Sequence, residues 1–161
     1  MFQRETLLNQ FSIDYFAQLA ADVTPEHFNL KPAGGGHSPL WILGHLAICG
    51  ELGQMLLGGE LQHQDWMATF GPGSSDDVAN PENYSKDEFM TNIKSSYEKL
   101  TQMANSADED TLNRPHGVEL LDETKLNTVG DLIGHLLTTH FAFHTAQLSG
   151  WRRATGHTHL F

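Results

Sequence analysis

Residues 128–156 of the chain read TVGDLIGHLLTTHFAFHTAQLSGWRRATG, which combines helix-start signals, an apolar stripe and two histidines four positions apart. Thr128 is a typical helix N-cap and Asp131 places an acid in the first turn, so a helix is predicted from Thr128 to about Ala154, before Gly156. Its first half carries apolar residues at spacings of three and four: Val129, Leu132, Ile133, Leu136 and Leu137. Such a stripe is the buried face of an amphipathic helix.

The second half of this helix continues the stripe with polar side chains among the apolar ones. Steps of three and four reach His140, Phe143, His144, Gln147 and Trp151. His135 falls on a different line, with Thr138, Thr145 and Ser149, and is predicted to face outward, without a role. Two histidines four positions apart rise by about 6 Å and turn by about 40°, so both imidazoles can reach one cation. The pair therefore predicts a metal site.

The other helices follow from the same periodicity, and no segment shows the sustained alternation of a strand. Helices are predicted at about 5–21, 38–57 and 85–105, with a single turn at 24–28. The first is predicted to bury a face formed by Leu8, Phe11, Tyr15, Phe16 and Leu19. Ser38 followed by Pro39, and Ser85 followed by Glu88, are start signals for the next two.

The connections between the helices predict the architecture. Residues 58–84 form a stretch of about 27 residues rich in Gly, Pro, Asn and Asp, too long for a tight hairpin. A stretch of this length can travel along a bundle, so helices two and three are predicted to run parallel. Residues 106–127 are predicted to be a loop. We therefore expect an all-α four-helix bundle with a long crossover between helices 2 and 3, as a single domain over residues 1–161.

A third histidine lies on the predicted buried face of the second helix. His45 stands on the same stripe as Trp41 and Ile48. An imidazole from this helix would complete a three-histidine face with His140 and His144, leaving a coordination position open for water or substrate. The alternative is that the three histidines are hydrogen-bonded in a core without metal.

The nearby polar residues narrow the kind of site. A ferritin-like di-iron bundle needs inward-facing carboxylates and two Glu-x-x-His pairs, but the one such pair, Glu60 with His63, falls in the long connection. A mononuclear site is therefore favoured. Gln147 is either a hydrogen-bond partner of a ligand or a packing amide. The tryptophans Trp41 and Trp151, with Phe143, either pack in the core or line a pocket.

The composition excludes several classes of protein. One cysteine, Cys49, allows no internal disulfide and no zinc site built on several thiolates; it is predicted to be a small core residue, with thiolate ligation as the alternative. A formal net charge of −11 disfavours nucleic acids and anionic membranes as partners. No apolar run is long enough to span a membrane and no secretory signal begins the chain, so a cytoplasmic location is expected.

Two stretches carry a family resemblance. SPLWILGHLAICGE at residues 38–51, together with residues 128–156, resembles the DinB-like family of metal-binding four-helix bundles, also called YfiT-like metal-dependent hydrolases. The resemblance implies an up-down-down-up bundle with His45, His140 and His144 as the metal ligands. It further implies one divalent transition metal (zinc, nickel, manganese or iron), a low-molecular-weight thiol as a partner, as in the thiol-dependent transferases and isomerases of that family, and a homodimer.

Two functions remain open from the sequence. The first is a metal-dependent enzyme, a hydrolase or a thiol-dependent transferase, that acts on a small-molecule substrate. The second is a non-catalytic metal-binding or stress-associated bundle protein. No catalytic base is assigned, because neither Glu51 nor Asp131 faces the predicted site, although His37 and His116 lie in loops that can approach its open end.

Overall fold

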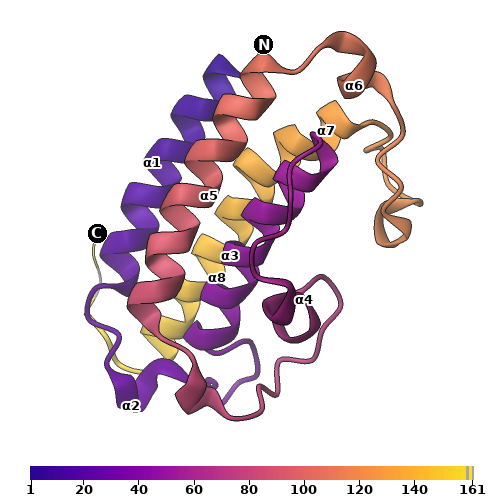
Figure 1. The fold of residues 1–161 in the computed structure, drawn as a ribbon. Helices are drawn as coiled ribbons and strands as arrows, with labels where there is room; N and C mark the ends of the chain where they lie inside the picture. The colour runs from indigo at the N-terminus through magenta and orange to yellow at the C-terminus, as the bar shows by residue number, and fades with distance from the viewer. Residues whose placement is uncertain (159, 161) are drawn as a thin grey trace.

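The computed structural model describes residues 1–158 and 160, and within these residues the chain is all-helical, without a strand. Its long helices are α1 (Gln3–Ala20), α3 (Pro39–Leu56), α5 (Lys86–Ser106) and α8 (Phe141–Ala154). These helices lie side by side in Figure 1, where α3 packs mainly against α5 and α1 packs against α8. None of the described helices combines the length and the apolar character needed to cross a membrane.

Helix α3 is the central helix, and its start signals are confirmed. Ser38 accepts a hydrogen bond from the Trp41 backbone N–H at 3.3 Å, and Pro39 occupies the first turn. The helix is buried around almost its whole circumference from Pro39 to Gln54, with Leu52 as the partly exposed exception. A helix that is buried on all sides has no single apolar face. His45 therefore lies in the interior whichever residues are chosen to define the buried face of α3.

The packed face of α1 differs from the predicted one. Phe16 and Leu19 are buried as predicted, but Leu8 and Phe11 are 53% and 68% exposed. The buried face contains Ile13 and Asn9 instead. The Asn9 side chain donates to the Leu137 carbonyl oxygen at 2.9 Å, so a polar residue belongs to the core because it satisfies a distant backbone group. A stripe drawn from apolar residues alone misses such a position.

The predicted helix from Thr128 to Ala154 begins and ends as expected, but it is not a regular α-helix throughout. Thr128 and Asp131 form a reciprocal capping box at the start of α7 (Val129–His135). The π-helical turn η3 (Leu136–His140) then leads into α8. A π turn holds an extra residue, so the buried face after it is displaced along the sequence.

The displacement corrects the predicted stripe of the last helix. Phe143 is 61% exposed, whereas Phe141 and Leu148 are fully buried. Thr145, which the regular phase placed on the outward line with His135, is also buried. Trp151 and His144 are buried as predicted.

The two long connections contain short helices that the sequence did not indicate. Between α3 and α5 lie α4 (Gln64–Phe70) and the 3-10 turn η1 (Pro81–Asn83), while the short helix α2 (Pro25–Phe28) matches the predicted turn before α3. Between α5 and α7 lie α6 (Glu109–Asn113) and the 3-10 turn η2 (Glu119–Leu121), so residues 106–127 are not simply a loop. The 114–127 segment projects from the body of the molecule at the right of Figure 1.

Candidate metal centre

His45 is oriented by a backbone carbonyl. Its Nδ1 lies 2.7 Å from the carbonyl oxygen of Phe70, the last residue of α4. A carbonyl oxygen only accepts, so Nδ1 carries the proton and Nε2 carries the lone pair. Burial lowers the pKa of His45, which favours this neutral form. The ring also stacks on Trp41, with centroids 4.6 Å apart. The Nε2 lone pair is thus held in a fixed direction.

His140 faces that lone pair from the end of η3. Its Nε2 is 3.2 Å from the Nε2 of His45, and its Nδ1 is buried with no hydrogen-bond partner among the described residues. Burial, together with the neighbouring His144 and His45, lowers the pKa of His140 to about 2. A neutral imidazole whose nitrogens point into a cluster of other neutral imidazoles has the protonation state that a metal ligand requires.

His144 completes the group of three histidines. Its ring centroid is 4.6 Å from those of both His45 and His140. Its Nδ1 donates to the Gln147 side-chain oxygen at 2.8 Å, which leaves Nε2 as the free nitrogen. Burial first, and then the neighbouring His45, lowers the pKa of His144 to about 3. The structure thus brings together the three histidines predicted from the sequence, and Gln147 is a hydrogen-bond partner of one of them.

Cys49 adjoins the same cluster, one helical turn after His45. Its Sγ is 3.5 Å from His45 Nε2, and the possible ligand atoms of His45, Cys49 and His140 all lie within 4.8 Å of one another, a set that does not include His144. Burial raises the pKa of the thiol to about 12, so without a cation it is protonated at neutral pH. A bound metal would favour the thiolate. Thiolate ligation was predicted only as the alternative to a core role, and the structure places this thiol among the candidate ligands.

Comparison with known families agrees with this arrangement. A family model described as the DinB superfamily matches residues 9–148, which include every member of the cluster. The chain belongs to the DinB superfamily. No curated protein sequence matches it. Together, the family and the His/Cys cluster support a possible metal site without determining which metal it holds.

The candidate metal centre of this DinB-superfamily chain opens into a cavity of about 810 Å³. Its lining includes Trp41 and the cluster, together with residues 114–118, Leu120 and Leu121. Phe143 also lines the cavity, whereas Trp151 does not and instead donates from Nε1 to the Leu30 carbonyl oxygen at 2.6 Å. A cavity of this size holds a small organic molecule beside the histidines.

His135 requires a correction, because it was predicted to face outward without a role. It is only partly exposed, and it lines the cavity beside His140, with ring centroids 5.5 Å apart. Its Nδ1 lies 2.6 Å from the Thr139 hydroxyl. The π turn changes the helical phase between the two histidines, so regular spacing misplaced the first.

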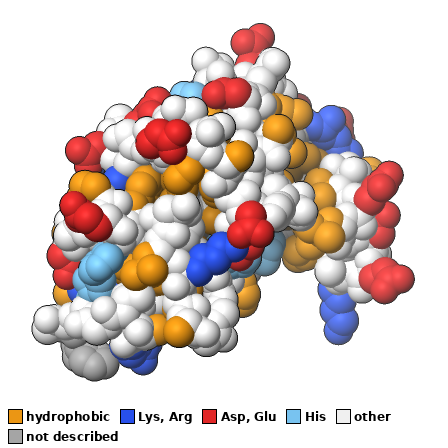
Figure 2. Space-filling view, turned by 90° about the horizontal axis from the view of Figure 1, so that it is seen from below, with side chains coloured by type: hydrophobic (Ala, Val, Ile, Leu, Met, Phe, Trp, Pro, Cys, Tyr) orange, Lys and Arg blue, Asp and Glu red, His pale blue; other side chains and the backbone are white. Residues whose placement is uncertain are grey.

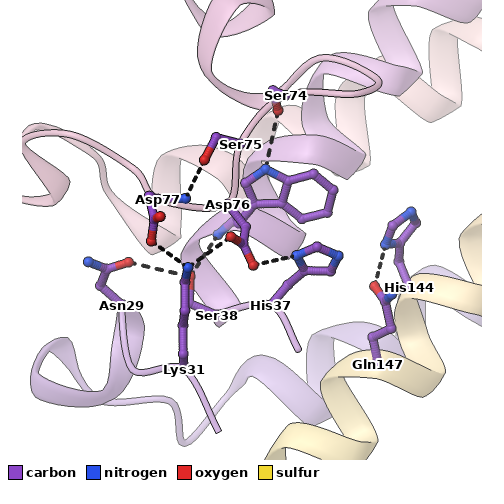
Figure 3. A network of polar contacts seen from close by, with 11 residues as sticks. Asn29, Lys31, His37, Ser38, Ser74, Ser75, Asp76, Asp77, His144 and Gln147 are labelled. Atoms are coloured by element: carbon purple, nitrogen blue, oxygen red, sulfur yellow. Dashed lines mark hydrogen bonds and ion pairs between the residues drawn. The ribbon is translucent and has the colours of Figure 1, made fainter. Parts of the chain in front are cut away.

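A polar network holds another part of the cavity lining, His37, where the turn before α3 meets the loop after α4 (Figure 3). His37 Nδ1 lies 3.1 Å from Asp76, and Lys31 holds the same carboxylate at 2.8 Å. The hydrogen bonds from Lys31 and, to a smaller extent, His37 lower the pKa of Asp76 although burial opposes them. The His37 ring stacks on Trp41 with centroids 4.0 Å apart, so Trp41 separates it from His45. Asp76 engages the Nδ1 of His37, so Nε2 is the ring nitrogen of His37 that Asp76 leaves free.

The other predicted candidates for a catalytic base already make hydrogen bonds outside the histidine cluster. His116 uses both ring nitrogens, because Nε2 donates to the Leu126 carbonyl oxygen and Nδ1 accepts from the Val118 N–H. Glu51 accepts hydrogen bonds from the backbone N–H groups of Gln62 and His63. Asp131 serves the capping box of α7. Of these predicted candidates, His37 lines the cavity and keeps a ring nitrogen available, and His135, which was not among them, shares both properties.

Proposed function

We propose that the chain binds one divalent transition metal through His45, His140 and His144, and that it is an enzyme acting on a small molecule. The observation that carries this proposal is the convergence of three neutral imidazoles beside an 810 Å³ cavity. Three ligands leave a coordination position for water or substrate, as in catalytic zinc sites. The ion is zinc, nickel, manganese or iron, since three imidazoles alone do not select among them.

We infer that the reaction is a hydrolysis or a transfer that uses a low-molecular-weight thiol. The metal would supply a Lewis acid that acidifies a bound water or binds a thiolate. His45 and His144 are held in direction by the Phe70 carbonyl and by Gln147. His37 lines the cavity with Trp41 between its ring and His45, so its Nε2 would take a proton from a substrate group in the cavity, while Asp76 holds Nδ1 in place.

We further propose an up-down-down-up four-helix bundle forming a single domain over residues 1–161. The packing of α3 against α5 and of α1 against α8 supports this arrangement, as do the long connections on either side of α5. A homodimer is part of the proposal, and the exposed apolar side chains Leu7, Leu8 and Phe11 on α1 support it. Light scattering on the purified protein would test the dimer.

The first experiment measures metal content and turnover together. Untagged protein is loaded with zinc, nickel, manganese or iron in turn, analysed for metal, and assayed for 4-nitrophenyl acetate hydrolysis and for substitution of the chloride of 1-chloro-2,4-dinitrobenzene by a thiol. We expect one metal per chain, lost in His140→Ala and retained in the matched control His135→Ala, which changes a cavity histidine outside the triad. Absence of metal would contradict the site, and absence of turnover with every metal would contradict the enzyme.

A closed, non-catalytic metal site is the second candidate, and the position of Cys49 favours it. A fourth ligand 3.5 Å from His45 Nε2 would complete a tetrahedral Cys-His₃ site of the structural type. Cobalt-substituted protein separates the two functions. An open site changes its visible spectrum when azide is added, whereas a closed site shows a thiolate-to-cobalt band that disappears in Cys49→Ala.

A further inference from the structure

The cavity beside the histidine cluster continues along α3 as an apolar channel. Its walls away from the histidines include Leu52, Met55 and Leu56 from α3, and Leu132 and Leu136 from α7 and η3. Three large apolar side chains that are unusually exposed, Met55, Leu120 and Phe143, also line it. Exposed apolar surface concentrated around one hollow is typical of a binding site for an apolar group.

The charges around this cavity oppose the charge of the whole chain. The chain carries 20 acidic residues against nine Lys and Arg, yet no Asp or Glu occurs among the described residues that line the cavity. Arg114 is the one Lys or Arg in that lining. In Figure 2 the hollow lies between the body of the molecule and the lobe at the right, whose outer edge carries acidic side chains. A wall with a guanidinium and no carboxylate favours an anion over a cation.

The position of Arg114 sets the length of a ligand that reaches both ends of the channel. Its guanidinium donates to the carbonyl oxygen of Leu56, the last residue of α3, whereas His45 lies eleven residues earlier (56 − 45) on the same helix. At 1.5 Å per residue the two points are separated by about 16 Å along the helix axis. A small acid held at Arg114 stays at that end of the channel, whereas a medium-chain acid covers most of this distance.

We propose that the cavity takes a medium-chain carboxylic acid or an amphiphile of the same chemistry. Its carboxylate pairs with Arg114, its apolar chain lies along Leu52 and Met55, and its far end points toward the histidine cluster. This inference rests on the proposed function only for the chemistry at the end of the ligand that is nearest the histidine cluster. Arg114, by this assignment, selects the substrate and takes no part in the chemistry.

The test measures calorimetric binding of three probes with the same chain length: decanoate, decanol and decyltrimethylammonium. Each is titrated into zinc-loaded and metal-free protein below its micelle concentration. We expect decanoate to bind most tightly and decyltrimethylammonium most weakly, in both forms of the protein. Arg114→Gln should weaken decanoate by about tenfold and leave decanol unchanged, because it removes a charge-assisted hydrogen bond. Arg153→Gln, an exposed arginine outside the cavity, is the matched control.

A second pair of variants locates the chain of the ligand. Leu120→Asp adds a carboxylate to the cavity wall at a side chain that is 69% exposed, so folding is spared. It should weaken both decanoate and decanol, whereas Gln102→Asp, at an exposed position of α5 outside the cavity, should weaken neither. Equal binding of the cation, or decanoate affinity unchanged in both cavity variants, would overturn the proposal. Decanoate binding that depends on zinc and ignores Arg114 would place the carboxylate on the metal and overturn the orientation.

The same titrations distinguish this inference from the proposed function. Metal content is measured separately on each sample, so a chain that binds decanoate but no metal would retain the ligand site and lose the metal centre. A chain that binds metal but no decanoate would retain the metal centre and lose the ligand site.

Discussion

At the scale of single residues, two of the candidate ligands, His45 and His144, owe their direction to a hydrogen-bond partner that is not itself a candidate ligand. The Phe70 carbonyl fixes the tautomer of His45, and Gln147 fixes that of His144. Partners of this kind set both the orientation and the basicity of a metal-binding imidazole. The His140 Nδ1 has no such partner, so packing alone holds this ring.

The role of Gln147 can be tested without changing a ligand. Gln147→Leu should lower metal affinity by about 10- to 100-fold, because the Nδ1–H of His144 loses its acceptor. Competition with a chelating dye measures this affinity. Gln147→Glu keeps an oxygen at the same place and should restore most of the binding. Equal affinity in the leucine variant would show that Gln147 is a packing amide.

The candidate ligands were predictable from the sequence because His45, His140 and His144 combine helical spacing with apolar neighbours. Cys49 was harder to assign, since a lone cysteine beside a buried stripe is usually a core residue. The candidate catalytic base, His37, was harder still to predict from the sequence. His37 and Asp76 are 39 residues apart and belong to two loops, so only the tertiary structure brings them into contact.

At the scale of secondary-structure elements, the π turn η3 is the feature that regular periodicity could not predict. It ends on His140, and it changes which face of α8 is buried. Asn9 of α1 supports this turn through its hydrogen bond to Leu137. The fold class and the helix starts at Ser38, Ser85 and Thr128 were predictable, because local capping determines them. The face of α1 was not, because a distant carbonyl determines it.

The support of the π turn by α1 gives a prediction that links stability to the site. Asn9→Leu should lower the free energy of unfolding by about 1–3 kcal/mol, because the Leu137 carbonyl oxygen loses its side-chain donor in a buried position. It should also weaken metal binding, since η3 carries His140. Urea denaturation and dye competition measure the two effects. Gln10→Leu, at an exposed neighbour, should change neither.

A buried carboxylate ties the connection after α3 to helix α5 and gives a pH-dependent prediction. Burial alone would raise the pKa of Glu51, but hydrogen bonds from His63, Asn92 and the backbone lower it below 4.5 overall. A lowered folded-state pKa stabilises the protein above pH 4.5, and this stability is lost as the pH falls through the folded-state value.

Glu51→Gln should therefore lower the free energy of unfolding by about 1–3 kcal/mol at pH 7, because its amide group faces donors. The difference from the unmodified protein should shrink as the pH falls below 4.5, where both side chains are neutral. Urea denaturation at pH 7 and at pH 3 measures it. The exposed Glu60→Gln should show no difference at either pH, and a constant difference for Glu51→Gln would contradict the ionised carboxylate.

At the scale of the whole molecule, the site depends on how closely α3 approaches α5. Gly50 has no room for a Cβ, which would overlap the Ser96 hydroxyl and lie 2.9 Å from Tyr97 Cδ2. These contacts are on the face of α3 away from the cavity, while His45 and Cys49 face it. A close fit on one face of a central helix therefore fixes the position of ligands on the other.

Two alanine substitutions in helices separate this packing constraint from helix propensity. Gly150 of α8 has no neighbour within 4 Å of a built Cβ, so Gly150→Ala should raise the free energy of unfolding by about 0.5–1 kcal/mol. Gly50→Ala gains the same propensity but forces the helices apart, so it should lower that free energy by about 1–3 kcal/mol. Because α3 would move with its ligands, Gly50→Ala should also weaken metal binding, and Gly150→Ala should leave it unchanged. If both substitutions stabilise the protein equally, close approach of α3 to α5 does not position the site.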